Sequence, residues 1–230
     1  MKNLGKVILH IPAREGSKRV PRKNMRLMNN KPMISYTVES SMLSNITDEL
    51  YVNTDSKEII DYININHKKF KIYKRNSYLA SDKVQSDEFN YDIIKNLNPD
   101  TLIMINPVCP LITKENILLA FEAYKNSDCD TLITCSSTQM QTFCDEEPVN
   151  IKLDEPLAPS QNNKKISILN WAITIWDANK FIKRFEEKGY ASLGENRLLL
   201  DIDPLHSLKV SEETDFIFIE NIIKVFNDKS

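Results

Sequence analysis

Short apolar runs rich in β-branched residues alternate along the first part of the chain with longer segments whose apolar residues recur at helical spacing. Such short runs fit strands that are buried on both faces of a sheet, and the helical spacing fits helices packed against that sheet. The predicted strands cover residues 7–11, 50–54, 70–73, 101–105 and 131–135, and the predicted helices cover 32–43, 57–66, 85–97 and 113–124. The alternation of strand and helix predicts an α/β fold with a mainly parallel, doubly wound sheet.

The pattern changes near residue 138. The sequence becomes polar, irregular and proline-bearing, with one short strand expected at 149–153. The later predicted elements are a long strand at 166–176, a helix at 178–187, a strand at 198–203 and a C-terminal helix at 211–226. Because no internal repeat or low-complexity linker divides the chain, we expect a single domain over residues 1–230 with a small β-rich excursion at about 138–175.

Composition places the chain among ordinary globular proteins. Apolar residues make up 41% and charged residues 27% of its 230 residues, and the formal net charge is −2. This balance gives no global positive field for nucleic acid, so an anion site must come from local clustering of basic residues. No apolar stretch approaches the ~18–20 residues that span a bilayer, and the first residues lack the apolar core of a secretory signal. We expect a cytoplasmic protein with neither a membrane nor a nucleic acid as partner.

Basic residues cluster directly after the first predicted strand. Residues 14–26 contain six Lys and Arg side chains and a single acid, Glu15. Ligands of α/β proteins bind beyond the carboxyl ends of the strands, where the backbone of Gly16 and Ser17 and the basic side chains would suit a phosphate-rich ligand. The segment has neither a GxxxxGK[ST] loop nor a GxGxxG fingerprint. The residues alone therefore indicate either an anion site or a solvated basic loop, and the lack of interleaved aromatic residues disfavours a nucleic-acid patch.

The sequence around this cluster resembles the opening of a known enzyme family. Residues 11–40 read IPAREGSKRVPRKNMRLMNNKPMISYTVES, which is similar to the opening of the sugar-acid cytidylyltransferases, the CMP-N-acylneuraminate synthetases, with Asn30 in place of a glycine. The related CMP-Kdo synthetases share the PAR opening but usually lack SKRxPxKN. Later segments agree in order: RNSYLASDKVQSD at 75–87 resembles the family's R-x-x-x-L-A-x-D, INPVCPL at 105–111 its QPTSPL turn, and LLLDIDPLHSLKVSEETDF at 198–216 its DIDTxxDxxxAE.

The resemblance implies a Rossmann-like sheet of the nucleotidyltransferase type and one reaction. The anomeric hydroxyl of a sugar acid attacks the α-phosphorus of CTP, pyrophosphate leaves, and a CMP-sugar forms. It also implies a homodimer in which the excursion of each subunit lies over the active site of its partner. By the same resemblance the triphosphate is assigned to Arg14, Ser17, Lys18 and Lys23, the cytosine to Asn24, Arg75 and the backbone of Ala80, and the ribose or sugar to Ser86 and Asn106. The expected catalytic residues are Arg14, Lys23 and Asp203.

A pair of carboxylates near the end of the chain indicates a metal site. Asp201 and Asp203 are two residues apart in the predicted strand at 198–203, so both side chains are expected on the same face. Two carboxylates together with phosphate oxygens suit Mg²⁺ (or Mn²⁺), which usually keeps several of its waters. Taken alone, the pair could also be the polar end of a strand.

The resemblance is weakest where the sugar acid should bind. The family's NG[AS]IYI segment reads NWAITI here, so Trp171 replaces a glycine and Thr174 replaces a tyrosine. Trp171 and Trp176 are expected to pack in the core or in an interface. Lys164 and Lys165 could meet the carboxylate of the acceptor, but only as point charges without the planar fork of arginine.

These differences leave several acceptors and two other classes of protein open. The acceptor could be a nonulosonic acid of the neuraminic, legionaminic or pseudaminic type, another acidic sugar such as a Kdo-like acid, or a phosphonate. A catalytically silent nucleotide-binding module on the same fold is one rival class, since fold does not guarantee activity. A nucleic-acid-binding protein is the other, and the acidic net charge disfavours it.

Overall fold

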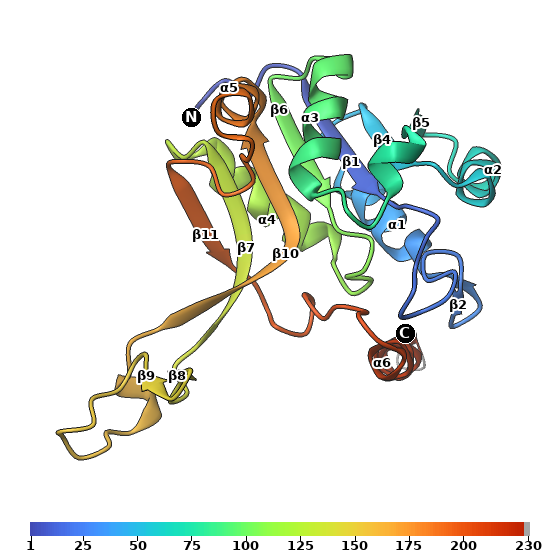
Figure 1. The fold of residues 1–230 in the computed structure, drawn as a ribbon. Helices are drawn as coiled ribbons and strands as arrows, with labels where there is room; N and C mark the ends of the chain where they lie inside the picture. Colours follow the sequence, from blue (N-terminus) through green and yellow to red (C-terminus); the bar gives the residue numbers. More distant parts are fainter. Residues whose placement is uncertain (228–230) are drawn as a thin grey trace.

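A seven-stranded sheet forms the centre of the computed structural model, which describes residues 1–227. The order of its strands is β11-β7-β10-β6-β1-β4-β5 (Figure 1). The strands are β1 (Val7–Pro12), β4 (Leu50–Thr54), β5 (Lys71–Lys74), β6 (Thr101–Ile105), β7 (Thr131–Thr138), β10 (Ile166–Asp177) and β11 (Arg197–Asp201). β10 runs antiparallel to both of its neighbours, β6 and β7, and every other neighbouring pair is parallel. The mainly parallel sheet predicted from the sequence is confirmed.

Helices cover both faces of this sheet. They are α1 (Ile34–Ser44), α2 (Lys57–Asn66), α3 (Ser86–Leu97), α4 (Lys114–Lys125) and α5 (Ala178–Lys188), while a further helix, α6 (Glu213–Asn227), packs elsewhere. Leu9 of β1 packs with α1, α2 and α4 in one core, whereas Ile8 packs with Ile93 of α3 and Phe181 of α5 in another. Successive strand residues face opposite sides of a sheet, so this division confirms the doubly wound architecture. Within residues 1–227 none of these helices is long and apolar enough to cross a membrane.

The C-terminal helix α6 packs against the segment that follows β1 and not against the sheet. A third core joins Val20, Met28 and Met33 of that segment to Val210, Phe216, Ile219 and Ile223. The segment itself turns back through the two short strands β2 (Leu27–Met28) and β3 (Lys31–Pro32). Arg26 donates hydrogen bonds of 2.5 and 2.6 Å to the two carboxylate oxygens of Glu213, and its guanidinium lies 4.2 Å from the centroid of the Phe216 ring. α6 therefore fixes the far end of the basic cluster.

Residues 139–165, which we call the arm, connect β7 to β10 and project from the body of the protein (Figure 1). The arm contains the short strands β8 (Phe143–Cys144) and β9 (Glu147–Pro148) and a 3₁₀ turn, η2 (Ser160–Asn162). The prediction of a strand at 149–153 is wrong, because β9 ends at Pro148 and the described chain brings no further strand alongside these residues. The long strand predicted at 166–176 is present as β10.

Among the boundaries that differ from the predicted ones, three have a clear local cause. α1 begins at Ile34 because Pro32 belongs to β3. β11 ends at Asp201, before the predicted end at Asp203, because Asp203 turns the chain by accepting a hydrogen bond from the backbone N–H of Leu205 at 2.8 Å. α6 begins two residues later than predicted, since the carboxylate of Asp215 accepts hydrogen bonds from the backbone N–H groups at 211 and 212.

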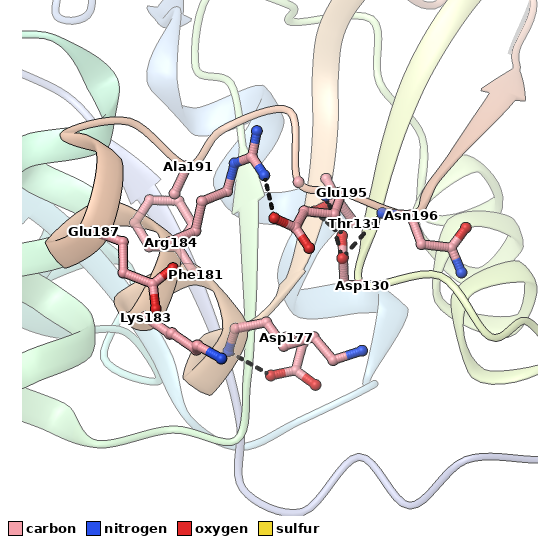
Figure 2. A pocket seen from close by; sticks show the side chains of 12 residues that line it. Asp130, Thr131, Asp177, Phe181, Lys183, Arg184, Glu187, Ala191, Glu195 and Asn196 are labelled. Carbon is pink, nitrogen blue, oxygen red and sulfur yellow. Dashed lines mark hydrogen bonds and ion pairs between the residues drawn. The ribbon is translucent and has the colours of Figure 1, made fainter.

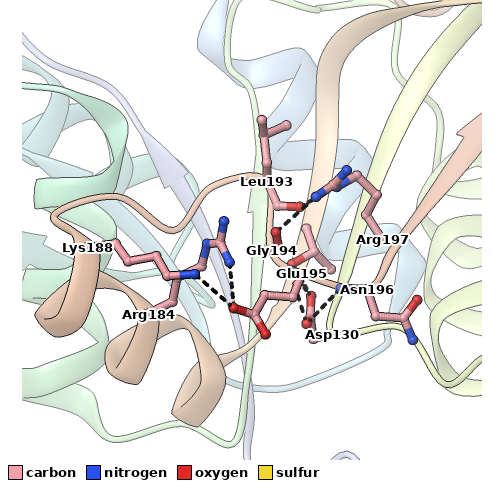
Figure 3. Close-up of polar contacts among 9 residues, drawn as sticks. Asp130, Arg184, Lys188, Leu193, Gly194, Glu195, Asn196 and Arg197 are labelled. Atoms are coloured by element: carbon pink, nitrogen blue, oxygen red, sulfur yellow. Dashed lines mark hydrogen bonds and ion pairs between the residues drawn. The ribbon is translucent and has the colours of Figure 1, made fainter.

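The loop before β11 depends on a glycine. Gly194 has a φ of +60°, and a Cβ there would lie 2.1 Å from Thr131 Oγ1 and 2.2 Å from Asp130 Oδ1. The Asp130 carboxylate accepts hydrogen bonds from the backbone N–H groups of Glu195 and Asn196 (Figure 3). The loop therefore cannot move away from the added Cβ without losing these bonds.

Gly194→Ala is expected to lower the free energy of unfolding by about 3 kcal/mol, because left-handed strain and steric overlap add. Gly189 is the matched control, since its φ is +77° but no atom lies within 4 Å of a Cβ placed there. Gly189→Ala should cost only about 1 kcal/mol. Urea unfolding of both variants measures the difference, and equal losses would contradict the packing described here.

Candidate active site

A cavity of about 800 Å³ opens beyond the carboxyl ends of the parallel strands, where α/β proteins bind ligands. Its wall includes eight of the nine residues predicted to bind the nucleotide: Arg14, Ser17, Lys18, Lys23, Asn24, Arg75, Ser86 and Asn106. The ninth, Ala80, at the end of the 3₁₀ turn η1 (Ser77–Ala80), lies behind the wall and accepts a hydrogen bond of 3.1 Å from Arg14 Nη1 through its carbonyl. Residues from distant parts of the sequence thus surround one space.

Asp82 balances part of the positive charge at this cavity. Its two carboxylate oxygens lie 2.6 Å from Arg14 Nη2 and 2.5 Å from Lys18 Nζ. These two cations, Lys18 first, hold the pKa of Asp82 below its usual range. Arg19 also lines the cavity and forms no ion pair within residues 1–227. The cavity therefore carries more positive than negative charge, which suits a polyanionic ligand.

Lys23 and Asn24 lie at the inner side of the basic loop. Lys23 Nζ donates a hydrogen bond of 2.8 Å to the carbonyl of Val210, which precedes α6. Burial lowers the pKa of Lys23, and the nearby charges of Arg19 and Arg14 lower it further. Asn24 Nδ2 donates to the carbonyl of Arg14, and its buried Oδ1 has no hydrogen-bond partner among the described residues. A ligand could satisfy this oxygen by donating a hydrogen bond to it.

Arg75 is a buried cation in the wall of the cavity. Its Nε donates to Asn53 Oδ1 at 2.7 Å, its Nη2 donates to the Asn53 carbonyl at 3.1 Å, and its guanidinium lies 4.5 Å from the centroid of the Phe89 ring. Burial lowers the pKa of Arg75 to about 10, so the side chain stays charged at neutral pH. The two hydrogen bonds to Asn53 and the contact with the Phe89 ring fix the position of this charge.

The loop after α5 closes another side of the cavity, and Asp87 of α3 holds this loop in place. The Asp87 carboxylate accepts hydrogen bonds from the backbone N–H groups of Ala191 and Ser192 and from Ser192 Oγ. Ser86 Oγ lies 3.4 Å from Ser192 Oγ. This contact between α3 and residues 191–192 was not predictable from the sequence, because it joins segments about a hundred residues apart.

The two carboxylates proposed to bind a metal are exposed but lie outside this wall. Asp201 Oδ2 is 2.6 Å from Lys165 Nζ, and Asp201 Oδ1 accepts a hydrogen bond from the backbone N–H of Ser137. The ion pair with Lys165 is the main cause that keeps the pKa of Asp201 low. The prediction that Asp203 continues the strand is wrong, since it forms the turn after β11. Within residues 1–227 no group of three or more acidic, His or Cys side chains is arranged to hold a metal ion.

The two tryptophans differ in their surroundings. Trp176 is buried, as predicted, and donates its indole N–H to the carbonyl of Ser192 at 2.9 Å. Trp171 lines the cavity and is only partly buried, so it does not belong to the core, and packing in an interface stays a prediction. Lys209, which the sequence analysis did not single out, also lines the cavity.

A second cavity of about 350 Å³ lies at the opposite edge of the sheet, near the start of β7 and of β11 (Figure 2). Four of its charged residues, Asp130, Asp177, Arg184 and Glu195, are engaged with one another or with the backbone. Arg184 lies 2.8 Å from Glu195, Asp177 accepts from the backbone N–H of Lys180, and Asp130 accepts from the backbone of Glu195 (Figures 2 and 3). These contacts indicate a structural role, which leaves the cavity at the carboxyl ends as the candidate active site.

Comparison with known proteins shows the family to which the chain belongs. The chain matches the family model described as cytidylyltransferase over residues 8–179. It is 26% identical over 230 residues to the CMP-N,N'-diacetyllegionaminic acid synthase of Legionella pneumophila, a match that covers 96% of this chain and 97% of the relative. It is 33% identical over 119 residues to the pseudaminic acid cytidylyltransferase of Campylobacter jejuni, covering 50% of this chain and 51% of the relative.

A solved structure shares the fold. The structure of a CMP:2-keto-3-deoxy-manno-octonic acid synthetase complexed with CTP matches with a TM-score of 0.67 at 12% identity and covers 95% of this chain and 98% of its own. The chain belongs to the cytidylyltransferase family, and its fold is of the nucleotidyltransferase type. It is an enzyme of the class that the resemblance of residues 11–40 predicts.

Arg75→Lys is expected to lower the free energy of unfolding by about 1–3 kcal/mol, because an ammonium group cannot reproduce both hydrogen bonds to Asn53 and loses the contact with the Phe89 ring. Arg22→Lys is the control, since Arg22 is an exposed arginine with one ion pair, to Glu58, and its loss should stay below about 0.5 kcal/mol. Urea unfolding of the two variants tests this. A similar small change in both would show that Arg75 is not the structural anchor of the cavity wall.

Proposed function

We propose that the enzyme transfers CMP from CTP to the anomeric hydroxyl of a nonulosonic, sialic-type sugar acid and releases pyrophosphate. The observation that carries the proposal is the cavity surrounded by Arg14, Lys18, Lys23 and Arg75 in a chain of the cytidylyltransferase family. The similarity along nearly the whole chain to a legionaminic acid synthase supports a sugar acid as the acceptor.

The reaction needs positioning and charge neutralisation more than covalent catalysis. The hydroxyl oxygen forms a bond to the α-phosphorus while the bond from that phosphorus to the bridging oxygen breaks, and the hydroxyl proton passes to solvent. Arg14, Ser17, Lys18 and Lys23 would hold the triphosphate. Arg14 and Lys23 would also neutralise the charge that develops on the departing pyrophosphate. The partial burial of Lys23 strengthens its interaction with phosphate oxygens.

The nucleoside would bind beside Asn24, Arg75 and the backbone of Ala80. The unpartnered Oδ1 of Asn24 can accept a hydrogen bond from the exocyclic amino group of cytosine. Ser86 and Asn106 would contact the ribose or the sugar acid. Asn106 lies where β6 meets β10, since its backbone N–H donates to the carbonyl of Ala172 at 2.9 Å.

Mg²⁺ (or Mn²⁺) is the proposed cofactor, and Asp203, which lies outside the cavity wall in this structure, is the carboxylate that is free to bind it. One of its carboxylate oxygens accepts from Leu205, and the other has no hydrogen-bond partner among the described residues. Asp201 would contribute only after Lys165 moves away from it. When bound, the ion would polarise the α-phosphate and favour ionisation of the attacking hydroxyl.

The purified protein is expected to release pyrophosphate from CTP in the presence of MgCl₂ and a nonulosonic acid, and mass spectrometry should find the CMP conjugate. The panel contains N-acetylneuraminic, legionaminic-type and pseudaminic-type acids, a Kdo-like acid and a phosphonate, which separates the alternative acceptors. CTP that binds without being consumed with any acceptor would indicate a silent nucleotide-binding module. Failure to bind CTP would contradict the proposal.

Asp203→Asn is expected to lower turnover at least tenfold, because it removes a charged metal ligand while keeping the oxygen that accepts from Leu205. Asp128→Asn serves as the control, since Asp128 is an exposed carboxylate far from the cavity. Steady-state rates at saturating MgCl₂ measure both variants. Equal rates in Asp203→Asn and the wild type would remove Asp203 from the catalytic residues.

We also propose that the enzyme is a homodimer that associates through the arm. The arm and the adjoining part of β10 expose large apolar side chains: Met140, Phe143, Val149, Leu153, Leu157 and Ile168. Leu153 and Leu157, for example, are 70% and 68% exposed. Such a group of exposed apolar side chains is unusual on the surface of a monomer. A second copy of the chain would cover them and could bring its arm towards the cavity.

Size-exclusion chromatography with light scattering should therefore give twice the mass of the chain. The double variant Leu153→Asp/Leu157→Asp should shift the protein to the monomer. Association would bury the new carboxylates in an apolar interface, where they have no partner of opposite charge. Ile65→Asp is the control, since Ile65 is 71% exposed on α2, away from the arm. A monomeric wild-type protein would contradict the proposal.

A further inference from the structure

The backbone at Trp171 is strained. β10 shifts its register against β7 between Leu169 and Thr174, and Trp171 lies in this bulge with a φ of +56°. Bulges with a residue in the left-handed region usually have glycine there, because a Cβ crowds the following carbonyl. A bulky residue in this region is an outlier, and such strain gathers at ligand sites.

Hydrogen bonds on both sides of the residue keep the strain in place. Asn170 Oδ1 accepts from Thr134 Oγ1 at 2.6 Å and from the backbone N–H of Ala172 at 3.2 Å, while Asn170 Nδ2 donates to Ser136 Oγ at 3.1 Å. The carbonyl of Ala172 accepts from the backbone N–H of Asn106 at 2.9 Å. Since β6 and β7 both hold the bulge, Trp171 cannot relax to an ordinary conformation.

The bulge places Trp171 at the end of the cavity away from the triphosphate residues. β10 lies on one side of β6, whereas β1 and the basic loop lie on the other. Leu193 lines the same cavity, and so does Lys209, which forms no ion pair within residues 1–227. The next residue, Val210, donates its backbone N–H to the carbonyl of Val108 at 2.8 Å and accepts a hydrogen bond of 2.8 Å from Lys23 Nζ, so Lys209 is held between the segment that follows β6 and the basic loop. The indole N–H of Trp171 likewise has no partner among the described residues.

We infer that Trp171 determines which acceptor the enzyme accepts: its indole forms the wall against which the sugar acid packs, and Lys209 meets the carboxylate of the acid. The inference rests on the proposed function and deepens it. Aromatic faces provide large apolar contact area with few rotatable bonds, and one well-placed cation fixes the orientation of a bound acid. The strained bulge is what presents the indole to the cavity.

Steady-state kinetics of three Trp171 variants separate the contribution of the indole from that of the backbone. The acceptor in these measurements is the acid of the panel that the wild type uses best. Trp171→Gly and Trp171→Ala should both raise the KM for the acid at least tenfold, which corresponds to about 1.4 kcal/mol, and leave the KM for CTP within about twofold. Trp171→Phe should retain most of the affinity for the acid. Lys209→Met should raise the same KM. The Gly variant should melt about 2–4 °C above the Ala variant, because only glycine tolerates the left-handed φ.

Tryptophan fluorescence gives a readout that does not need turnover. The chain has two tryptophans, of which Trp176 is buried. Titration of the wild type with N-acetylneuraminic, legionaminic-type and pseudaminic-type acids should change the emission with at least one of them. The change should disappear in Trp171→Phe and persist in Trp176→Phe. Asn98→Gly, which replaces another left-handed residue outside the cavity, should leave all binding unchanged.

Several results would overturn the inference. A raised KM for CTP with an unchanged KM for the acid would assign the indole to the nucleotide. Lost acceptor affinity in the Ala variant but not in the Gly variant would assign the effect to bulge geometry. No emission change with any of the acids would show that none packs on Trp171. The proposed function fails separately, through the absence of any CMP conjugate from the wild type.

Discussion

Mutual repulsion between cations is the constraint on which the rest of this structure depends. The chain gathers basic residues in and beside one cavity, and acidic groups from other parts of the fold hold several of them in place, including Arg22 and Arg26, which lie outside the cavity wall. Asp82 binds Arg14 and Lys18, Glu58 binds Arg22, and Glu213 of the C-terminal helix binds Arg26. The packing of α6 on the segment after β1, and of α3 on the loop at 191–192, is therefore what makes the charged cavity possible.

The same electrostatics connect stability to function. Burial and neighbouring cations lower the pKa of Lys23 and of Arg75, so their charged forms are less favourable than in water. A polyanion in the cavity would favour those charged forms, and a ligand that binds only the folded state stabilises it. Binding of a nucleoside triphosphate would therefore reduce the electrostatic repulsion between the cations of the cavity.

The sequence predicted the parts of this protein that depend on local pattern. Apolar periodicity located the strands and helices of both sheet faces, and eight of the nine residues that the resemblance assigns to the nucleotide line one cavity. Features set by distant contacts could not be predicted. Asp87 acts on residues 191–192, the two-residue strands depend on their partners, and the left-handed Trp171 exists only because Asn170, Thr134 and Asn106 hold it. The end of β11 was predicted two residues too late, because an aspartate such as Asp203 can either continue a strand or start a turn.

The proposed function requires the cavity to bind the triphosphate of CTP through its cations. Calorimetric titration with CTP and with CMP, each at low and at high ionic strength, tests it most directly. CTP should bind much more tightly than CMP, and the difference should shrink as salt screens the charges of residues 14–26. Equal affinities for CTP and CMP, or a difference that does not respond to salt, would contradict it.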